Sequence, residues 1–324
     1  MKKKILLSIV APVFNEEEII EAFLEELLSV LQTLTYPFEI ILIDDGSVDH
    51  TIERCLPFIE KHAEIRLLSF SRNYGHEIAS TAGLDLAQGD YVVLMDSDLQ
   101  HPPIVIPQLL QKAQEGYDVV CAARTNRDQE TWLKKYTAKL FYKFSRKLTG
   151  LAISEEVGNF RILNRKVVDS ITKMKESNRH LIMMFAYVGY KTTMIDYTCA
   201  PRQAGQSKYS LRKLVSLALD SIIGFSSRPL RLMSVLSIFL SLIMMGYAGF
   251  ILIQKLFTHQ QLADGMASII FLISGLFSVL FLFLAVISEY ISRILIETKN
   301  RPLYTIKEEI SQIILKNKIG TPVK

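Results

Sequence analysis

Short apolar runs alternate with amphipathic stretches through the N-terminal part of the chain. Runs of strand length cover residues 6–13, 38–43, 65–70, 91–95 and 118–122. Between them, residues 16–31, 51–62, 76–87 and 104–115 show helical spacing of apolar positions, and Asn15 is expected to cap the first helix. The alternation predicts an α/β fold with a doubly wound, mostly parallel sheet.

Two longer apolar runs near the C-terminus contain no charged residue, residues 235–253 and 266–288. As helices they would be about 28 and 35 Å long, and a bilayer core is about 30 Å thick. We therefore predict transmembrane helices at about 233–255 and 266–288. Because the link between them is short and polar, we expect a hairpin over residues 232–296, and both long ends of the chain then lie on one side.

Basic residues indicate which side that is. Arg228 and Arg231 precede the first predicted span and Arg293 and Lys299 follow the second, whereas the link offers only Lys255. Positive residues favour the cytoplasmic side. We therefore expect a multi-pass protein of the inner (cytoplasmic) membrane, with residues 1–208 as a cytoplasmic domain and 297–324 as a cytoplasmic tail.

Composition narrows the function classes. The net charge of +4 is only mildly basic and gives no support for a nucleic-acid partner. The three cysteines Cys55, Cys121 and Cys199 are widely spaced and form no CxxC pair, which argues against a disulfide framework or a zinc site. We interpret them as small buried apolar residues in a reducing compartment.

Polar motifs follow each predicted strand of the first domain. In chain order they are "PVFNEE", "DDGS", "SRNYG", "DSDLQ" and "ARTNR". Turn chemistry explains some of these residues, because Asp, Asn and Gly suit turns. It does not easily explain acids after two strands and arginines after two others. Since ligands bind at the carboxyl ends of parallel strands, we expect one ligand site built from these loops.

The fourth motif points to a metal. Asp96 and Asp98 are two residues apart at a strand end, which places two hard oxygen ligands near one point and suits Mg²⁺ or Mn²⁺. Arginines in adjacent loops suit a diphosphate. The chain has no GxxxxGK[ST] or GxGxxG motif, which weakens the ATPase and dinucleotide-binding interpretations.

Five segments together carry a family resemblance: "SIVAPVFNEEE", "IDDGSVDHT", "SRNYGHEIASTAGLDLAQGDYVVLMDSDLQHPP", "GYDVVCAAR" and "RQAGQSKYSLRKL". They resemble family 2 glycosyltransferases, and within them the polyisoprenyl-phosphate branch that includes dolichyl-phosphate mannose synthase. The predicted hairpin resembles that of bacterial members. The resemblance implies a GT-A fold, a nucleotide-sugar donor, which we expect to be a UDP-sugar, and inverting transfer to a lipid phosphate, undecaprenyl phosphate if the source is bacterial.

The resemblance also implies residue roles. Asp98 is expected to be the main metal ligand, with Gln100 as a second, and Asp96 to lie by the ribose and the metal. Arg124 is expected to hold donor phosphates. The expected nucleotide-binding residues are Pro12, Phe14, Glu16, Asp44, Asp45, Ser47 and Asp96, and those expected to meet the acceptor phosphate or donor diphosphate are Arg202, Ser207 and Lys208; anchoring to anionic lipid is an alternative for Lys208 and Arg212.

One position departs from the family pattern. Close relatives often have "GDFRL" where this chain has "GNFRI", so that Asn159 replaces an acid that has been a candidate base. An amide cannot accept the proton, but a phosphate monoester is largely dianionic at pH 7 and has no proton that must be removed. We expect Asn159 to position the reactants and Arg161 to orient a phosphate, with a structural salt bridge as the alternative for Arg161.

Two further segments suggest contact with the membrane. Apolar residues recur at helical spacing over 209–231, which suits a juxtamembrane amphipathic helix, although an ordinary packed helix has the same pattern. Residues 132–148 are basic and aromatic and are a candidate for a second interfacial helix.

Two other functions share these features. A processive membrane polysaccharide synthase uses similar catalytic loops, but it usually carries a QxxRW motif and more spans, and the only tryptophan here is Trp132. A non-catalytic membrane scaffold is the third hypothesis, and the intact Asp96, Asp98 and Gln100 argue against it. The sequence leaves open the sugar, the glycan pathway and the oligomeric state, a homo-oligomer included.

Overall fold

The computed structural model describes residues 6–124, 157–197, part of 230–250 and 265–319. These residues divide into two compact units. The first contains the sheet and is built from the chain up to β7 and from Pro302 onward, and the second contains the long helix α10.

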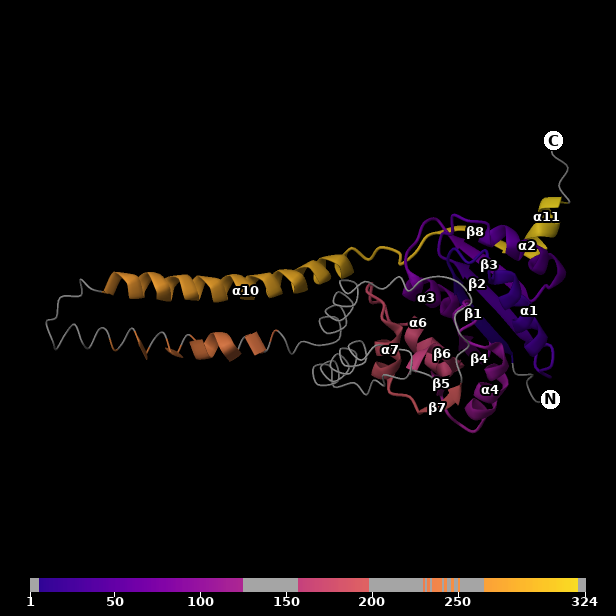
Figure 1. The fold of residues 1–324 in the computed structure, drawn as a ribbon, viewed down its shortest axis with the longest axis horizontal. Helices are drawn as coiled ribbons and strands as arrows, with labels where there is room; N and C mark the ends of the chain where they lie inside the picture. The colour runs from indigo at the N-terminus through magenta and orange to yellow at the C-terminus, as the bar shows by residue number, and fades with distance from the viewer. Residues whose placement is uncertain are drawn as a thin grey trace. The chain divides into compact units, whose positions relative to one another are not determined.

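A single mixed sheet forms the centre of the first unit (Figure 1). Within the described residues it has eight strands in the order β7-β5-β6-β4-β1-β2-β3-β8. Most neighbours in it are parallel, but β6 is antiparallel to β4 and β5, and β8 is antiparallel to β3. The strands are β1 (Leu7–Val13), β2 (Phe38–Asp44), β3 (Ile65–Phe70), β4 (Tyr91–Leu94), β5 (Val119–Arg124), β6 (Val157–Asn164), β7 (Thr192–Tyr197) and β8 (Ile306–Ser311).

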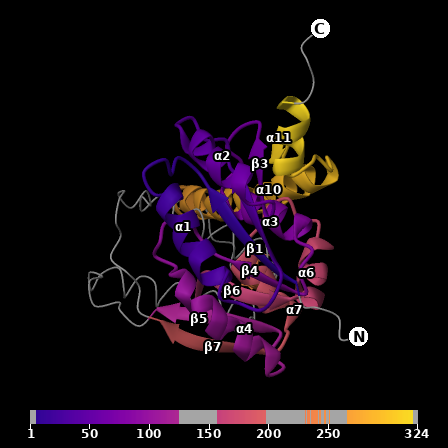
Figure 2. The same cartoon turned by 90° about the vertical axis from the view of Figure 1, so that its right-hand side faces the viewer.

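Helices cover both faces of this sheet (Figures 1 and 2). On one face α3 packs on β1 and β2, and α6 contacts both α3 and α7. On the other, α1 packs against α2, and α4 packs on β5 and β6. The helices are α1 (Ile20–Leu31), α2 (Thr51–Lys61), α3 (His76–Leu86), the short 3-10 helix η1 (Pro103–Val105), α4 (Ile106–Gln114), α6 (Arg165–Thr172), α7 (Leu181–Val188) and α11 (Gln312–Ile319).

The core explains why these elements form. In α1, Phe23, Leu27 and Leu31 recur every four residues and are fully buried. On the opposite face, α3 approaches β1 closely at Gly83, where an added Cβ would lie 2.1 Å from Cγ1 of Val10. A side chain at this position would push α3 away from the sheet that it covers.

The α/β fold predicted from the periodicity is confirmed, and each of the five predicted strands is present within two residues of its expected bounds. The predicted cap at Asn15 is wrong, because α1 begins at Ile20. Asn15 has a left-handed φ of 54°, and its side-chain oxygen accepts a hydrogen bond from Val48 N instead. The two cysteines within the described residues, Cys55 and Cys121, are buried and free, as expected.

The separation of residues 297–324 as a tail needs correction. Residues Ile306–Ser311 form β8 and pair with β3, from Arg66 opposite Ser311 to Phe70 opposite Ile306. Ile310 is buried in the same core as β3, and this burial holds the C-terminal segment on the sheet. Residues from Pro302 onward therefore belong to the sheet unit.

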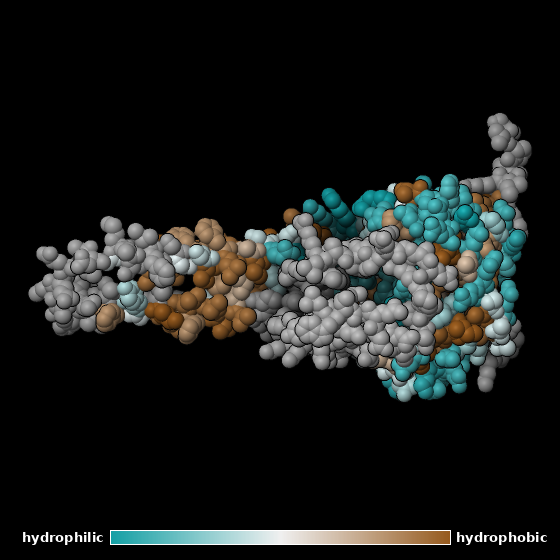
Figure 3. All heavy atoms as spheres, viewed as in Figure 1, coloured by the Kyte–Doolittle hydropathy of each residue, from teal (hydrophilic) through white to brown (hydrophobic). Residues whose placement is uncertain are grey.

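The second unit contains one described helix that is long and apolar enough to cross a membrane. The helix α10 (Met266–Thr298) has 33 residues, and the qualifying segment is Gly275–Thr298. It extends beyond the predicted end at residue 288. Its apolar side chains, among them Phe277, Phe281 and Ile291, are exposed in the structure (Figure 3). The predicted first span is only partly described, so the two-helix hairpin remains a prediction.

Candidate active site

Loops from the carboxyl ends of β1 and β2 are bound directly to each other. Asn15 N donates to Ser47 Oγ (2.9 Å), and Glu16 N donates to Thr51 Oγ1 (2.8 Å). The carbonyl oxygen of Pro12 accepts from Ser97 Oγ, which ties the end of β1 to the loop after β4. Residues expected to bind a nucleotide, Pro12, Phe14, Glu16 and Ser47, are therefore brought together from two loops.

The two acids at the end of β2 accept hydrogen bonds from other groups of the protein. Asp44 is fully buried and accepts hydrogen bonds from Ser47 N (3.0 Å) and Ser69 Oγ (2.7 Å). Asp45 is 3% exposed and accepts from Tyr74 N (2.7 Å) and Gly75 N (2.9 Å). Burial raises the pKa of Asp45, and the two backbone N–H groups oppose this. Both acids hold loops in place, and direct contact of Asp44 with a base stays a prediction.

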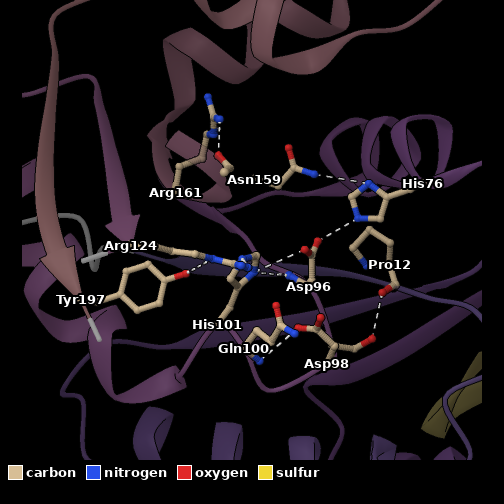
Figure 4. A network of polar contacts seen from close by, with 12 residues as sticks. Pro12, His76, Asp96, Asp98, Gln100, His101, Arg124, Asn159, Arg161 and Tyr197 are labelled. Carbon is tan, nitrogen blue, oxygen red and sulfur yellow. Dashed lines mark hydrogen bonds and ion pairs between the residues drawn. The ribbon is translucent and has the colours of Figure 1, made fainter. Parts of the chain in front are cut away.

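Asp96, after β4, lies between two histidines (Figure 4). Its Oδ1 is 2.8 Å from Nε2 of His76, and its backbone N donates to Nδ1 of His101 (2.9 Å). Burial alone would raise the pKa of Asp96, but His101, His76 and Arg124 stabilise the charged form and lower the pKa overall. Burial likewise opposes protonation of His76, yet the hydrogen bond and the charge of Asp96 raise its pKa to about 9. Asp96 is thus a carboxylate in a basic surrounding.

His101 supports Asp96 from the interior. Its side chain is 2% exposed and stacks on Phe160, with ring centroids 5.0 Å apart. Burial lowers its pKa. Beside it, Arg124 Nε donates to the hydroxyl of Tyr197 (3.1 Å), so that β4, β5, β6 and β7 all contribute to one cluster. This cluster holds Arg124 at the edge of the site, where a guanidinium suits a phosphate.

Asp98 and Gln100 form a tight turn just beyond Asp96. Gln100 N donates to Asp98 Oδ1 (3.1 Å), and Leu99 between them has a left-handed φ of 57°. Both side chains are partly exposed, as Asp96 is, while Leu99 is buried. The turn directs the polar side chains outward while the apolar one packs inside.

Asp96 and Asp98 fit a hard divalent cation. Among the described residues, no group of three or more His, Cys, Asp and Glu side chains could hold a metal ion. Mg²⁺ requires less from the protein, because it binds through one or two carboxylates together with substrate phosphates and water. Two partly exposed carboxylates at a strand end meet this requirement.

Asn159 on β6 lies beside His76, and Arg161 follows two residues later on the same strand (Figure 4). Asn159 Nδ2 is 3.4 Å from His76 Nδ1. Arg161 is 2% exposed, donates to the carbonyl oxygen of Gly158 (2.6 Å), and lies 4.3 Å over the ring of Phe185. Burial lowers the pKa of Arg161. Within the described residues, Asn159 Oδ1 and Arg161 Nε are buried polar atoms with no hydrogen-bond partner.

The remaining predicted positions lie outside the described residues. They are Arg202, Ser207 and Lys208, together with the two predicted interfacial segments 132–148 and 209–231, of which only Leu230 is described. Conversely, the structure adds three residues to which the sequence analysis assigned no role: His76, His101 and Tyr197. Both histidines stood in quoted motifs, "SRNYGHE" and "DSDLQHPP", and His101 directly follows the assigned Gln100. Tyr197 had no such signal.

The doubly wound sheet with these loops at its carboxyl edge has a GT-A-like fold. The model of the family described as glycosyl transferase family 2 matches residues 8–172, and the chain belongs to this family. The expected family is thereby confirmed.

Relatives extend the similarity to nearly the whole chain. It is 41% identical over 302 residues to an uncharacterised glycosyltransferase of Synechocystis, covering 93% of this chain and 95% of that protein. It is 39% identical over 303 residues to the bactoprenol glucosyl transferase of Shigella phage SfV, covering 94% and 98%. Among solved structures, mannosyl-3-phosphoglycerate synthase of Rubrobacter xylanophilus matches with a TM-score of 0.50 at 19% identity over 70% of this chain and 74% of that one, which concerns the fold alone.

Proposed function

We propose that the chain transfers one sugar from a nucleotide-sugar, a UDP-sugar, to a polyisoprenyl phosphate such as undecaprenyl phosphate. The product is a lipid-linked monosaccharide for modification of cell-envelope glycans. The observation that carries the proposal is the partly exposed pair Asp96 and Asp98, set among basic side chains at the carboxyl edge of a family 2 sheet. The relatives named bactoprenol glucosyl transferase support the lipid acceptor.

The donor half of the site follows from the strand-end loops. We propose that Pro12, Phe14, Glu16 and Ser47 contact the nucleotide and that Arg124 pairs with the diphosphate. Asp96, Asp98 and Gln100 would hold Mg²⁺ or Mn²⁺. When bound, the metal offsets the negative charge that builds on the leaving nucleoside diphosphate.

The acceptor half requires no side-chain base. An oxygen of the lipid phosphate attacks C1 of the sugar, and the bond from C1 to the diphosphate breaks with inversion. The attacking oxygen of a phosphate dianion carries no proton, so correct placement and charge compensation can carry the step. We propose Asn159 for this placement, because its Oδ1 has no hydrogen-bond partner among the described residues. Arg161 is 2% exposed and donates to the carbonyl oxygen of Gly158, so in this proposal it supports β6 beside Asn159.

The sheet itself supports an even number of membrane crossings. β7 ends at Tyr197 and β8 begins at Ile306, and both strands belong to the same sheet. If Gly275–Thr298 crosses a bilayer, the chain must cross once more between these strands to return to the same side. The apolar run 235–253 is the segment of suitable length and composition. We propose that this pair is the membrane hairpin and that the sheet faces the cytoplasm.

The test is a reconstituted transfer reaction. Purified full-length protein is mixed with undecaprenyl phosphate, Mg²⁺ or Mn²⁺ and a panel of nucleotide-sugars, and the lipid product is identified by mass spectrometry. We expect a single added hexose-sized unit and release of the nucleotide only when lipid phosphate is present. A growing polymer would indicate a processive synthase, and nucleotide release with water alone as the acceptor would contradict the lipid acceptor.

A further inference from the structure

A segment near the C-terminus lies along a loop of the candidate active site. We call residues 302–306 the C-terminal strap and residues 71–75, which follow β3, the β3–α3 loop. Ser71 N donates to the carbonyl oxygen of Thr305 (3.0 Å), so the pairing of β8 with β3 continues into the loop. The strap is therefore in direct backbone contact with the loop.

Aromatic side chains strengthen this contact. Tyr304 stacks on Phe70, with ring centroids 4.9 Å apart and planes at 20°. Tyr74 meets the same Phe70 edge-on at 5.6 Å. Such pairs are worth about 0.5–1.5 kcal/mol beyond their burial. The ring of Phe70 is thus held between one residue of the strap and one residue of the loop.

Two hydroxyl groups lie in the same region. The hydroxyl of Tyr304 is near the carboxyl of Asp85 on α3, and the side chain of Thr305 is near the hydroxyl of Tyr74. Residues 304 and 305 therefore adjoin both the β3–α3 loop and the helix that follows it.

The loop, in turn, connects directly to the proposed donor site. Its backbone N–H groups at Tyr74 and Gly75 are the donors to Asp45, and the next residue, His76, forms the 2.8 Å contact with Asp96. Its other side is pressed against Gly46, where an added Cβ would lie 2.6 Å from the carbonyl carbon of Arg72. A loop so tightly packed moves as a unit, and a shift at Tyr74 displaces His76 and Asp45 together.

We propose that the C-terminal strap positions the β3–α3 loop and thereby sets the geometry of the donor half of the site, with Tyr304 as the principal positioning residue. The inference rests on the proposed function for its consequence, which is nucleotide binding. Only residues 299–301 separate the strap from α10. The chain thus joins its apolar helix to a strap that pairs with the loop directly before His76.

The test compares side chains at position 304. Tyr304→Ala removes the ring, Tyr304→Leu keeps apolar volume without the stack, and Tyr304→Phe removes only the hydroxyl. Ile313→Ala, on the exposed face of α11, is a matched control in the same C-terminal segment, since Ile313 is 72% exposed. Each full-length protein is measured by calorimetric titration with UDP and Mn²⁺ and by amide hydrogen exchange of peptides that cover residues 71–78.

We expect Tyr304→Ala and Tyr304→Leu to weaken UDP binding about tenfold, equivalent to about 1.4 kcal/mol, and to speed exchange in residues 71–78. Tyr304→Phe and Ile313→Ala should stay within about twofold of the parent in both measurements. A purely structural role would lower the melting temperature and leave the UDP affinity of the folded fraction unchanged. If Tyr304→Ala does not fold, Tyr304→Leu decides.

Hydrogen exchange and UDP titration test two separate parts of the proposal. Unchanged exchange at residues 71–78 in both ring-removing variants overturns the strap as a positioning device. Faster exchange with unchanged UDP affinity overturns its link to the donor site. If the parent protein binds neither UDP nor GDP with Mn²⁺, the proposed donor is wrong, and so is the inferred effect of the strap on nucleotide binding. The hydrogen-exchange result then still tests whether the strap positions the β3–α3 loop.

Discussion

Two pairs of acids at the same edge of the sheet have opposite surroundings. Asp44 ends β2 and Asp45 follows it. Both are at most 3% exposed, and their oxygens accept hydrogen bonds from Ser47, Ser69 and the β3–α3 loop. Asp96 and Asp98 follow β4 and remain partly exposed. The same residue type at the ends of β2 and β4, the two strands that flank β1, therefore serves internal structure in one pair and suits a ligand in the other.

The difference follows from the supply of hydrogen-bond donors. Backbone N–H groups of a turn and a buried hydroxyl converge on Asp44 and Asp45, and buried acids persist only where such donors exist. The neighbours of Asp96 are side chains of His76, His101 and Arg124, which stabilise its charge without covering it. Mutations can separate the two pairs, because one should govern stability and the other activity.

The largest effect is expected for Asp98→Ala. Loss of a proposed metal ligand should lower transfer by about 10³-fold or more, because compensation of charge on the leaving group is lost. The melting temperature should change little, since Asp98 is partly exposed at a turn. Initial rates and thermal unfolding of the membrane-bound protein check both statements. Near-normal turnover would contradict the metal assignment.

Asp45→Ala should mainly lower stability, whereas Asp98→Ala should mainly lower activity. It leaves the N–H groups of Tyr74 and Gly75 without their acceptor, and each unsatisfied buried group costs about 1–3 kcal/mol. We expect a loss of about 2–4 kcal/mol in the free energy of unfolding, seen as a fall of about 5–15 °C in the melting temperature. Asp98→Ala is its control. Equal melting temperatures for the two variants would remove the distinction between the pairs.

Ser69→Ala removes one hydrogen bond to Asp44 and should cost less stability than Asp45→Ala. Ser69 is 1% exposed and donates to Asp44 Oδ2, while Ser47 N still serves the other oxygen. Removing one donor to a buried carboxylate should cost about 1–3 kcal/mol, less than Asp45→Ala. Denaturant unfolding measures it. A loss greater than that of Asp45→Ala would show that Asp44, and not Asp45, is the main support of these loops.

The smallest effect is expected for Asn159→Ala. If no base is needed at this position, the variant loses only a placement contact worth about 1 kcal/mol, which is roughly a fivefold lower rate. Steady-state kinetics with lipid phosphate as the varied substrate give the value. Asn159→Asp is the matched control, and it should not exceed the parent rate. Inactivation as complete as that of Asp98→Ala would contradict a reaction without a base here.

The sequence predicted the parallel part of the fold because each parallel strand there is buried on both faces and appears as a continuous apolar run. Strand β7 escaped notice because it is an edge strand with alternating exposure, and β8 because "IKEEIS" is mostly polar. Only long-range pairing with β3 makes β8 a strand, and periodicity within one segment does not contain that information.

The candidate site shows the same limit. Motif positions pointed to Asp96 and Asp98, because strand ends converge at one edge, and the family resemblance pointed to Asn159 and Arg161. They did not reveal that Asp44 and Asp45 accept hydrogen bonds from groups of the protein itself, since their burial depends on loops that are distant in sequence. His76 is a similar case, because its contact with Asp96 joins residues 20 positions apart.

Strand β8 also affects how the chain can assemble. The edge of β3 that it covers is made early in synthesis, yet its partner follows about 240 residues later, after the apolar helix α10. Until β8 arrives, β3 presents an open row of backbone groups, which is the kind of edge that joins other chains. Pairing of β8 with β3 therefore cannot precede the synthesis of α10, so the nascent protein must accommodate this apolar helix before it can close that edge.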